Sequence, residues 1–267
     1  MWKKAEHSLK AMRSTLVRNL LQPTQAAAKL RPSARGLSLP ENQELLPLFV
    51  NAMLKSPALV VNRFKDGRQD AFARADARVV CRYLWLTASP ERFAQHVYPA
   101  VYDVSDPGTF GDSLPIVESS WSAIPPIEQQ SKKVLLPRRL PASSEFLRAD
   151  GIYLVHDGGD ELDLFIGPNA PRDKVDALLG GSPPLVDRWV VLVDRKTPQS
   201  SKTLAVARQL LRSKDEALAV NLFGQLHPEE IKSLAKLVED KIYLETSYAS
   251  FLAQLYTDVQ TMAASSS

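Results

Sequence analysis

The spacing of hydrophobic residues predicts four helices in the first hundred positions. One stripe recurs every three or four residues and predicts an amphipathic helix over residues 2–21. A second predicts a helix that begins near Pro47 and stops at Ser56, because proline is tolerated in the first turn of a helix but not in its interior. Ser89 and Pro90 are start signals for a later helix. Between them, a third stripe predicts an inward helical face made of Phe72, Ala75, Val79, Tyr83 and Leu86.

The pattern changes between Tyr102 and Pro141, where prolines and glycines prevent a long helix. This segment is interpreted as a crossing between two domains. It has room only for short strands, at Asp103–Val104 and at Leu114–Val117.

A hairpin follows this crossing. Ile152–Val155 is a short run of strand formers, and His156–Glu161 has the composition of a turn. Gly158 and Gly159 can adopt positive φ, which lets the chain reverse there. Residues 162–166 then alternate between apolar and other side chains, the period expected of a half-buried strand.

The remaining pattern alternates helices and strands, as expected of a small α/β domain. Trp189–Val193 is continuously apolar, which predicts a strand covered on both faces. Helices are expected at 172–179, ended by Gly180, at 203–211, from 228 onward and at 247–261. A further strand is expected at 217–220 and a disordered tail at 263–267.

Composition places the chain among ordinary globular proteins, with room for two domains in 267 residues. No apolar run reaches the roughly 18 residues needed to span a bilayer, and no signal-peptide core follows Met1. A cytosolic protein, or one on the cytosolic face of a membrane, is therefore expected. The single cysteine, Cys81, excludes an internal disulfide within this sequence and is expected to be a buried thiol.

Charge is distributed unevenly along the chain. Residues 1–110 hold 16 Lys and Arg against 9 Asp and Glu, a net of +7, and residues 111–267 hold 17 against 21, a net of −4, which together give +3. A basic half suits an anionic partner, and the alternative is a solvated helical surface with no dedicated partner.

Catalytic patterns are scarce. The four histidines, His7, His96, His156 and His227, lie far apart, and no phosphate-binding glycine loop is present. The acidic residues Asp157, Asp160, Glu161 and Asp163 suit a calcium site by charge but lack its spacing, so a solvated turn is expected. Tyr248, Phe251 and Tyr256 lie at helical spacing and are expected to be core residues. The sequence thus predicts no catalytic residue, no cofactor-binding residue, no metal ligand and no nucleic-acid partner.

Four phrases, in order, resemble one known family. Residues 45–56 read LLPLFVNAMLKS and resemble a signature of the cargo-adaptor subunit of the COPII vesicle coat, the secretory protein twenty-four family. Tyr98–Tyr102 resembles its "YP-x-LY" phrase. Residues 136–167 resemble its "LP-x-x-LP-x-SSE … GIYL … LW-x-G" pattern, and residues 237–252 resemble "LVED(K/R) … SY-x-x-FL".

The resemblance implies an α+β protein with an N-terminal all-α helical domain and a gelsolin-like α/β domain, whose central mixed sheet is flanked by helices. The expected domains are a helical domain at 1–110, an interdomain crossing at 111–135, a gelsolin-like domain at 136–262 and a disordered tail at 263–267. The family's zinc finger, trunk and β-sandwich, which precede the helical domain, have no counterpart in this sequence. The chain thus resembles the C-terminal part of an adaptor, without the structural zinc and without residues that can be assigned to cargo.

The implied function is a non-catalytic interaction part of a COPII coat cargo adaptor. It would act in ER-to-Golgi vesicle transport of proteins, as a peripheral component on the cytosolic face of the endoplasmic reticulum and of COPII vesicles. The implied partners are the other coat subunits, above all the sister subunit that activates the coat GTPase. Cargo would bind mainly through upstream domains.

Two alternatives remain. The sister subunit itself carries a catalytic arginine in a late stretch of its gelsolin-like domain, whereas the comparable segment here, Val220–Pro228, has no arginine. An actin- or calcium-responsive gelsolin module is the other alternative, suggested by the acidic hairpin tip.

Weak binding to an anionic membrane surface is a further expectation, because basic residues gain free energy near anionic lipid. The expected contributors are Arg13, Arg18, Arg74, Arg78 and Arg82.

Overall fold

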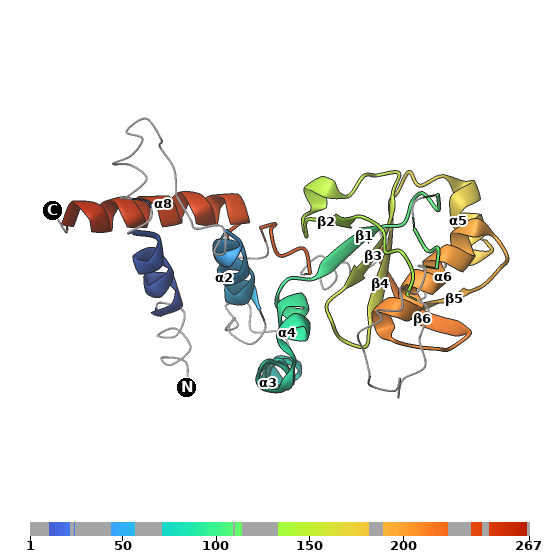
Figure 1. The fold of residues 1–267 in the computed structure, drawn as a ribbon, viewed down its shortest axis with the longest axis horizontal. Coiled ribbons are helices and arrows are strands. Elements are labelled where there is room, and N and C mark those ends of the chain that lie inside the picture. Colours follow the sequence, from blue (N-terminus) through green and yellow to red (C-terminus); the bar gives the residue numbers. More distant parts are fainter. Residues whose placement is uncertain are drawn as a thin grey trace, which may run out of the picture. The chain divides into compact units, whose positions relative to one another are not determined.

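The computed structural model describes most of the chain (Figure 1). The described residues are 11–21, 24, 44–56, 71–108, 110–113, 133–181, 189–223, 236–241 and 246–265, with only the backbone described for 71–78. The chain forms two compact units. We call them the helical unit, Met1–Tyr98 with Leu237–Ser267, and the sheet unit, Pro99–Lys236.

The helical unit is built from helices at both ends of the chain. A helix over residues 11–21 is followed by α2 (Leu46–Lys55), α3 (Ala71–Thr87) and α4 (Pro90–Val97), and α8 (Tyr248–Ser265) joins them from the C-terminal end. Their shared core consists of buried side chains from the first helix, α2 and α8, namely Leu16, Val17, Leu20, Val50, Phe251, Leu255 and Val259.

The helix starts follow the signals in the sequence. Pro47 lies in the first turn of α2, where its missing N–H removes no hydrogen bond of the helix. Ser89 caps α4, since its side chain accepts a hydrogen bond from the backbone N–H of Arg92 at 3.3 Å. Both predicted starts are confirmed.

The sheet unit contains a six-stranded mixed sheet in the order β2-β1-β3-β4-β6-β5. The strands are β1 (Ala100–Asp103), β2 (Arg139–Leu140), β3 (Ile152–His156), β4 (Leu162–Ile166), β5 (Trp189–Val193) and β6 (Ala217–Phe223). All neighbouring pairs are antiparallel except β4 and β6, which run parallel. The predicted hairpin is β3–β4, and Gly158 in its turn has φ 78°.

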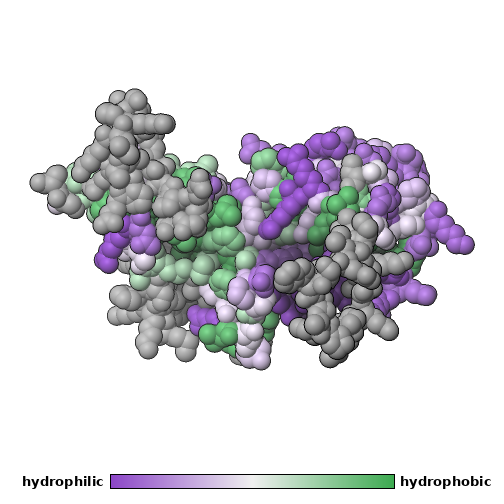
Figure 2. All heavy atoms as spheres, viewed as in Figure 1, coloured by the Kyte–Doolittle hydropathy of each residue, from purple (hydrophilic) through white to green (hydrophobic). Residues whose placement is uncertain are grey.

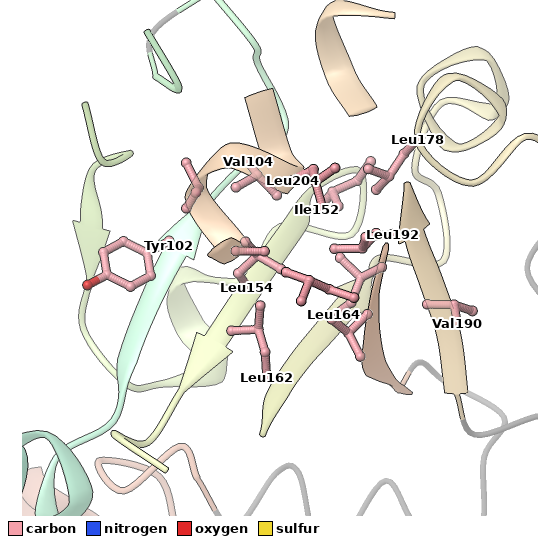
Figure 3. Packing of buried hydrophobic residues seen from close by; sticks show 14 of the residues in the cluster. Tyr102, Val104, Ile152, Leu154, Leu162, Leu164, Leu178, Val190, Leu192 and Leu204 are labelled. Carbon is pink, nitrogen blue, oxygen red and sulfur yellow. The ribbon is translucent and has the colours of Figure 1, made fainter. Parts of the chain in front are cut away.

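Two helices, α5 (Arg172–Leu179) and α6 (Pro198–Leu211), pack on one face of this sheet. Figure 3 shows Leu154, Leu164 and Leu192 from three strands converging near Leu204 of α6. The opposite face is also buried at the centre of the sheet, where the Phe165 and Phe223 rings lie 5.2 Å apart. The α+β prediction is therefore confirmed.

The predicted domain boundaries differ from those of the structure. β1 pairs with β3, so residues 100–103 belong to the sheet and not to a helical domain ending at 110. Residues 111–113 and 133–135 also lie in the sheet unit, where Ser113 and Val134 form a bridge. α8 belongs to the helical unit although the prediction placed it with the sheet, and it continues to Ser265 through part of the predicted disordered tail.

Burial also departs from prediction in both units. Val79, Tyr83 and Leu86 of α3 were expected to face a core, but they are 66%, 66% and 86% exposed. β5 was expected to be covered on both faces, yet Trp189 and Val191 are exposed. Conversely, β4 was expected to be half-buried, and its first four residues are all buried because the centre of the sheet is covered on both faces.

Several predictions lie outside the described residues. These are the first part of the 2–21 helix, the strand at 114–117 and the helix that begins at Pro228. Within the described part of the chain, no helix is long and apolar enough to cross a membrane.

Candidate functional site

The segment 136–167 contains the longest family-like phrase, and its residues hold the start of the hairpin together. Ser143 accepts a hydrogen bond from the N–H of Glu145 and caps a short 3-10 helix, η2 (Ser144–Phe146). The buried Tyr153 hydroxyl then accepts a hydrogen bond from the backbone N–H of Arg148 at 2.8 Å. Burial raises the pKa of Tyr153, so this phenol stays neutral at physiological pH.

Gly167 closes the same segment by a close backbone approach. Its N–H donates to the carbonyl of Gly151 at 2.9 Å, and the N–H of Asn169 donates to the carbonyl of Ala149 at 2.7 Å. A Cβ on Gly167 would lie 2.3 Å from the Ala149 carbonyl oxygen, so only glycine fits without a backbone shift. The conspicuous residues of this segment therefore build the fold and do not line a ligand site.

The other family-like phrases meet in the helical unit. Lys55, in the phrase that ends α2, donates to the carbonyls of Val238 at 2.6 Å and Asp240 at 2.7 Å. Tyr98, which begins the second phrase, donates its hydroxyl to the Glu239 carboxylate. Family-like segments that lie about 140–190 residues apart in the sequence thus contact one another, and these contacts stabilise the fold.

The acidic turn of the β3–β4 hairpin is organised around a lysine. Lys236 Nζ lies 2.8 Å from Asp163 Oδ2 and 3.4 Å from Asp157 Oδ2, and the Asp163 side chain is only 2% exposed. Asn221 donates to Asp163 Oδ1 at 2.9 Å and to Glu161 at 3.2 Å. The expectation of a simply solvated turn was wrong for Asp157 and Asp163, because both carboxylates are engaged by this cation.

Two opposing effects act on the pKa of Lys236. Burial lowers it by penalising the charged form, while the carboxylates of Asp157 and Asp163 raise it. The carboxylates prevail, and the pKa of Lys236 is raised above its ordinary value. The side chain is therefore a permanent cation at neutral pH and a structural counter-ion for the turn. The described carboxylates give the calcium-responsive alternative no support.

Cys81 is buried, as predicted, and lies beside a histidine. Its Sγ is 3.4 Å from His96 Nε2 and 3.4 Å from Ser56 Oγ. A thiol next to an imidazole is a pairing used by nucleophilic cysteines, but this residue is only 4% exposed, so a substrate cannot reach the sulfur. His156 is likewise buried, and its Nε2 lies 3.0 Å from the Gly159 carbonyl within the turn.

Groups of metal-binding type are absent from the part of the chain that the structure describes. No three or more of its His, Cys, Asp and Glu residues are grouped so as to hold a metal ion. His7 and His227 lie outside this part. Phe251 is buried in the core as predicted, while Tyr248 and Tyr256 are half-buried.

Exposed apolar side chains are the clearest features suited to binding. They gather on α3, at Val79, Val80, Tyr83 and Leu86, and on β5, at Trp189 and Val191. Figure 2 shows hydrophobic atoms at the surface over α3, at the lower centre of the view. Contiguous exposed apolar residues are typical of interaction surfaces.

The basic residues proposed to meet a membrane have different surroundings. Arg13 pairs with Asp258 of α8 at 2.6 Å, while Arg18 and Arg82 are exposed. The side chains of Arg74 and Arg78 lie outside the described set.

Comparison with known proteins agrees with this organisation. Residues 1–95 match the family described as the Sec23/Sec24 helical domain. The chain is 26% identical to the protein transport protein SEC24 C of Arabidopsis thaliana over 85% of its length, and 26% identical to human Sec24A over 94%. The chain is thus similar to Sec24 proteins along most of its length. These alignments cover 18% and 21% of the two relatives, so the chain spans about a fifth of the length of the Sec24 proteins that it matches.

The fold of this chain is that of a solved structure. It superimposes on the crystal structure of the human COPII-coat protein Sec24c with a TM-score of 0.65 and 23% identity, covering 98% of this chain and 31% of that one. The likeness therefore includes both units.

Lys236 is the residue that sequence reasoning missed. It stands about 70 positions from its acidic partners and carries no local motif. The only signal in the sequence was the excess of carboxylates at the turn, since a charge buried on folding requires a counter-ion.

Proposed function

We propose that the chain is a non-catalytic part of a COPII coat cargo adaptor that works by protein contacts in ER-to-Golgi transport. The observation that supports this most is the extent of the similarity to Sec24 proteins, which reaches 94% of the chain and includes both units. A single domain shared among unrelated proteins would match only one unit. The proposal needs no cofactor, and the family-like residues have structural roles that suit a scaffold.

The proposed partners are the other coat subunits, above all the sister subunit that activates the coat GTPase. Cargo would bind mainly through regions that the Sec24 relatives possess beyond the matched fifth. The proposed place of action is the cytosolic face of the endoplasmic reticulum and of COPII vesicles.

A chimera tests the proposal directly. In human Sec24A, the region aligned to this chain is replaced by this chain, and a matched control simply deletes that region. The chimera is expected to co-purify with the sister subunit and to support vesicle budding from ER membranes with purified coat proteins. A folded chimera that performs no better than the deletion would overturn the proposed function.

A GTPase assay separates the chain from the sister subunit. The segment Val220–Pro228 has no arginine that could stabilise charge on a transferring phosphate, so adding this chain should leave GTP hydrolysis by the coat GTPase at its intrinsic rate. Acceleration of the kind that the sister subunit gives would contradict the assignment.

The membrane contact is proposed as a weak, charge-dependent one. Arg18 and Arg82 are exposed, whereas Arg13 is paired with Asp258. Flotation with liposomes that contain phosphatidylserine is expected to recover more protein than flotation with neutral liposomes, and only at low salt. Equal recovery from both lipids would contradict this part of the proposal.

A further inference from the structure

The outward face of α3 carries a cluster of exposed apolar side chains, which we call the α3 ridge: Val79, Val80, Tyr83 and Leu86. Val79, Tyr83 and Leu86 follow one another at spacings of four and three residues, so they lie on one side of the helix. Leu86 is the most exposed of them, at 86%. Neighbouring apolar side chains that are left in solvent to this extent mark a binding surface.

The opposite face of α3 is fixed to the rest of the helical unit. Cys81 Sγ lies 3.4 Å from Ser56 Oγ and 3.4 Å from His96 Nε2. The Trp85 ring packs edge-on against the Phe93 ring of α4, with the ring centroids 5.5 Å apart. These contacts direct the α3 ridge outward, so it is already ordered before it binds.

The α3 ridge belongs to the basic unit of the chain. The helical unit holds 17 Lys and Arg against 11 Asp and Glu, a net charge of +6, whereas the sheet unit holds 16 against 19, a net of −3. These counts include every ion pair inside a unit, so internal partners do not cancel the positive excess. Residues 77–90 contain two arginines, Arg78 and Arg82, and no acidic residue. Such a ridge suits a surface that is anionic outside and apolar beneath.

We propose that the α3 ridge inserts into the headgroup and upper acyl region of a membrane that contains anionic lipid. Valine and leucine side chains gain free energy by leaving water, and tyrosine favours the interface, where its ring is in the apolar layer and its hydroxyl stays hydrated. The positive charge of the helical unit attracts it to anionic headgroups and brings the ridge to the lipid. This inference rests on the membrane contact proposed above, to which it adds an apolar component, and it does not depend on the coat assignment.

Shape and charge favour lipid over protein as the occupant. The ridge lies on the convex surface of a single helix, which in a protein partner requires a groove of matching shape, whereas lipid headgroups move apart around it. A second copy of the chain would bring another unit of net charge +6 against the first, and like charges repel.

Flotation of the full chain with vesicles of phosphatidylcholine and phosphatidylserine tests the inference. The double variant Val79→Gln, Leu86→Gln removes apolar area from the ridge without changing charge, and its partition coefficient should fall about tenfold or more. The matched control is Val191→Gln with Leu135→Gln, a valine and a leucine that are exposed in the acidic sheet unit, and it should float like the original chain. Circular dichroism checks that each variant folds.

A fluorescent label measures insertion directly. Cys81 is the single cysteine and is only 4% exposed, so a thiol dye should label the variant Leu86→Cys at position 86 alone. An environment-sensitive dye there should shift its emission to shorter wavelength with phosphatidylserine vesicles, and lipids brominated on their acyl chains should quench it. The same dye on the variant Val191→Cys should show neither effect. Small, highly curved vesicles should bind more chain than large ones of the same composition.

Flotation of the Val79→Gln, Leu86→Gln variant at the level of the original chain would overturn the inference, and the charge-dependent contact alone would stand if recovery still required phosphatidylserine. An unshifted dye at position 86 on vesicles that recover the chain would overturn it too. A chain that floats with no vesicle removes both the inference and the membrane contact, while budding with the chimera remains a separate test of the coat function. If the double variant floats normally but a chimera carrying it no longer co-purifies with the sister subunit, the α3 ridge binds protein instead of lipid.

Discussion

Replacing Lys236 with methionine should destabilise the sheet unit, because it leaves Asp163 buried without its cation. The Asp163 side chain is 2% exposed, while Lys236 and Asp157 are 19% and 24% exposed. Removing one partner from a fully buried ion pair costs about 3–5 kcal/mol. Here Asn221 still donates to Asp163 and water reaches part of the cluster, so we expect a loss of about 2–3 kcal/mol.

Hydrogen exchange of central amides in β3 and β4 measures this loss in the sheet unit alone, without assuming that the two units unfold together. A loss of 2–3 kcal/mol predicts exchange roughly 30- to 150-fold faster than in the original chain at pH 7. Lys202→Met is the matched control. Lys202 is similarly buried at 24% exposure, but its partner Asp112 is 67% exposed, so that variant should lose only about 0–1 kcal/mol.

The pH dependence gives the experiment a second readout. The pKa of Lys236 is raised by folding, so its contribution to stability is complete below the ordinary lysine value and is lost as the pH rises through the raised value. The difference between Lys236→Met and the original chain should therefore be constant near neutrality and shrink above pH about 10.5. Exchange rates equal to those of Lys202→Met, or a difference unchanged by pH, would refute the reasoning.

Three further perturbations test the packing. Gly167→Ala should destabilise the sheet unit by about 1–3 kcal/mol, because the new Cβ meets the Ala149 carbonyl at 2.3 Å, whereas Gly181→Ala, with nothing within 4 Å, should be nearly neutral in thermal denaturation. Ser89→Ala should lower the stability of the helical unit by about 1 kcal/mol in hydrogen exchange of α4, and an unchanged rate would mean that the cap is dispensable. Arg13→Gln should cost at most about 1 kcal/mol, and the cost should vanish in 1 M salt, since the pair is partly exposed.

Local sequence determined the elements whose signals are local. Ser89 and Pro90 start α4, Gly180 with φ 77° ends α5, and the turn around Gly158 reverses the β3–β4 hairpin, each within a residue or two of the prediction. The spacing of the apolar residues was enough to tell helices from strands. Side chains return to the same face every 3.6 residues in a helix and every 2 in a strand, whatever that face later contacts.

Only the tertiary structure decided which apolar faces are covered. The pattern of α3 predicts an inward face that includes Val79 and Tyr83, and the folded unit leaves it exposed. The apolar run of β5 predicts burial on both sides, and its position at the sheet edge leaves Trp189 and Val191 in solvent. Periodicity shows that a face is apolar, but what lies against that face depends on neighbours far away in the chain.

The same reason explains the domain limits and the acidic turn. Residues 100–103 become a strand of the sheet by pairing with β3, about 50 positions later, and α8 returns from the chain's end to pack against Leu16 and Leu20. Lys236 reaches Asp163 across 73 positions. Sequence supplied the residues for these contacts, whereas the pairing of distant segments depends on the free energy of burying them together, which no local pattern encodes.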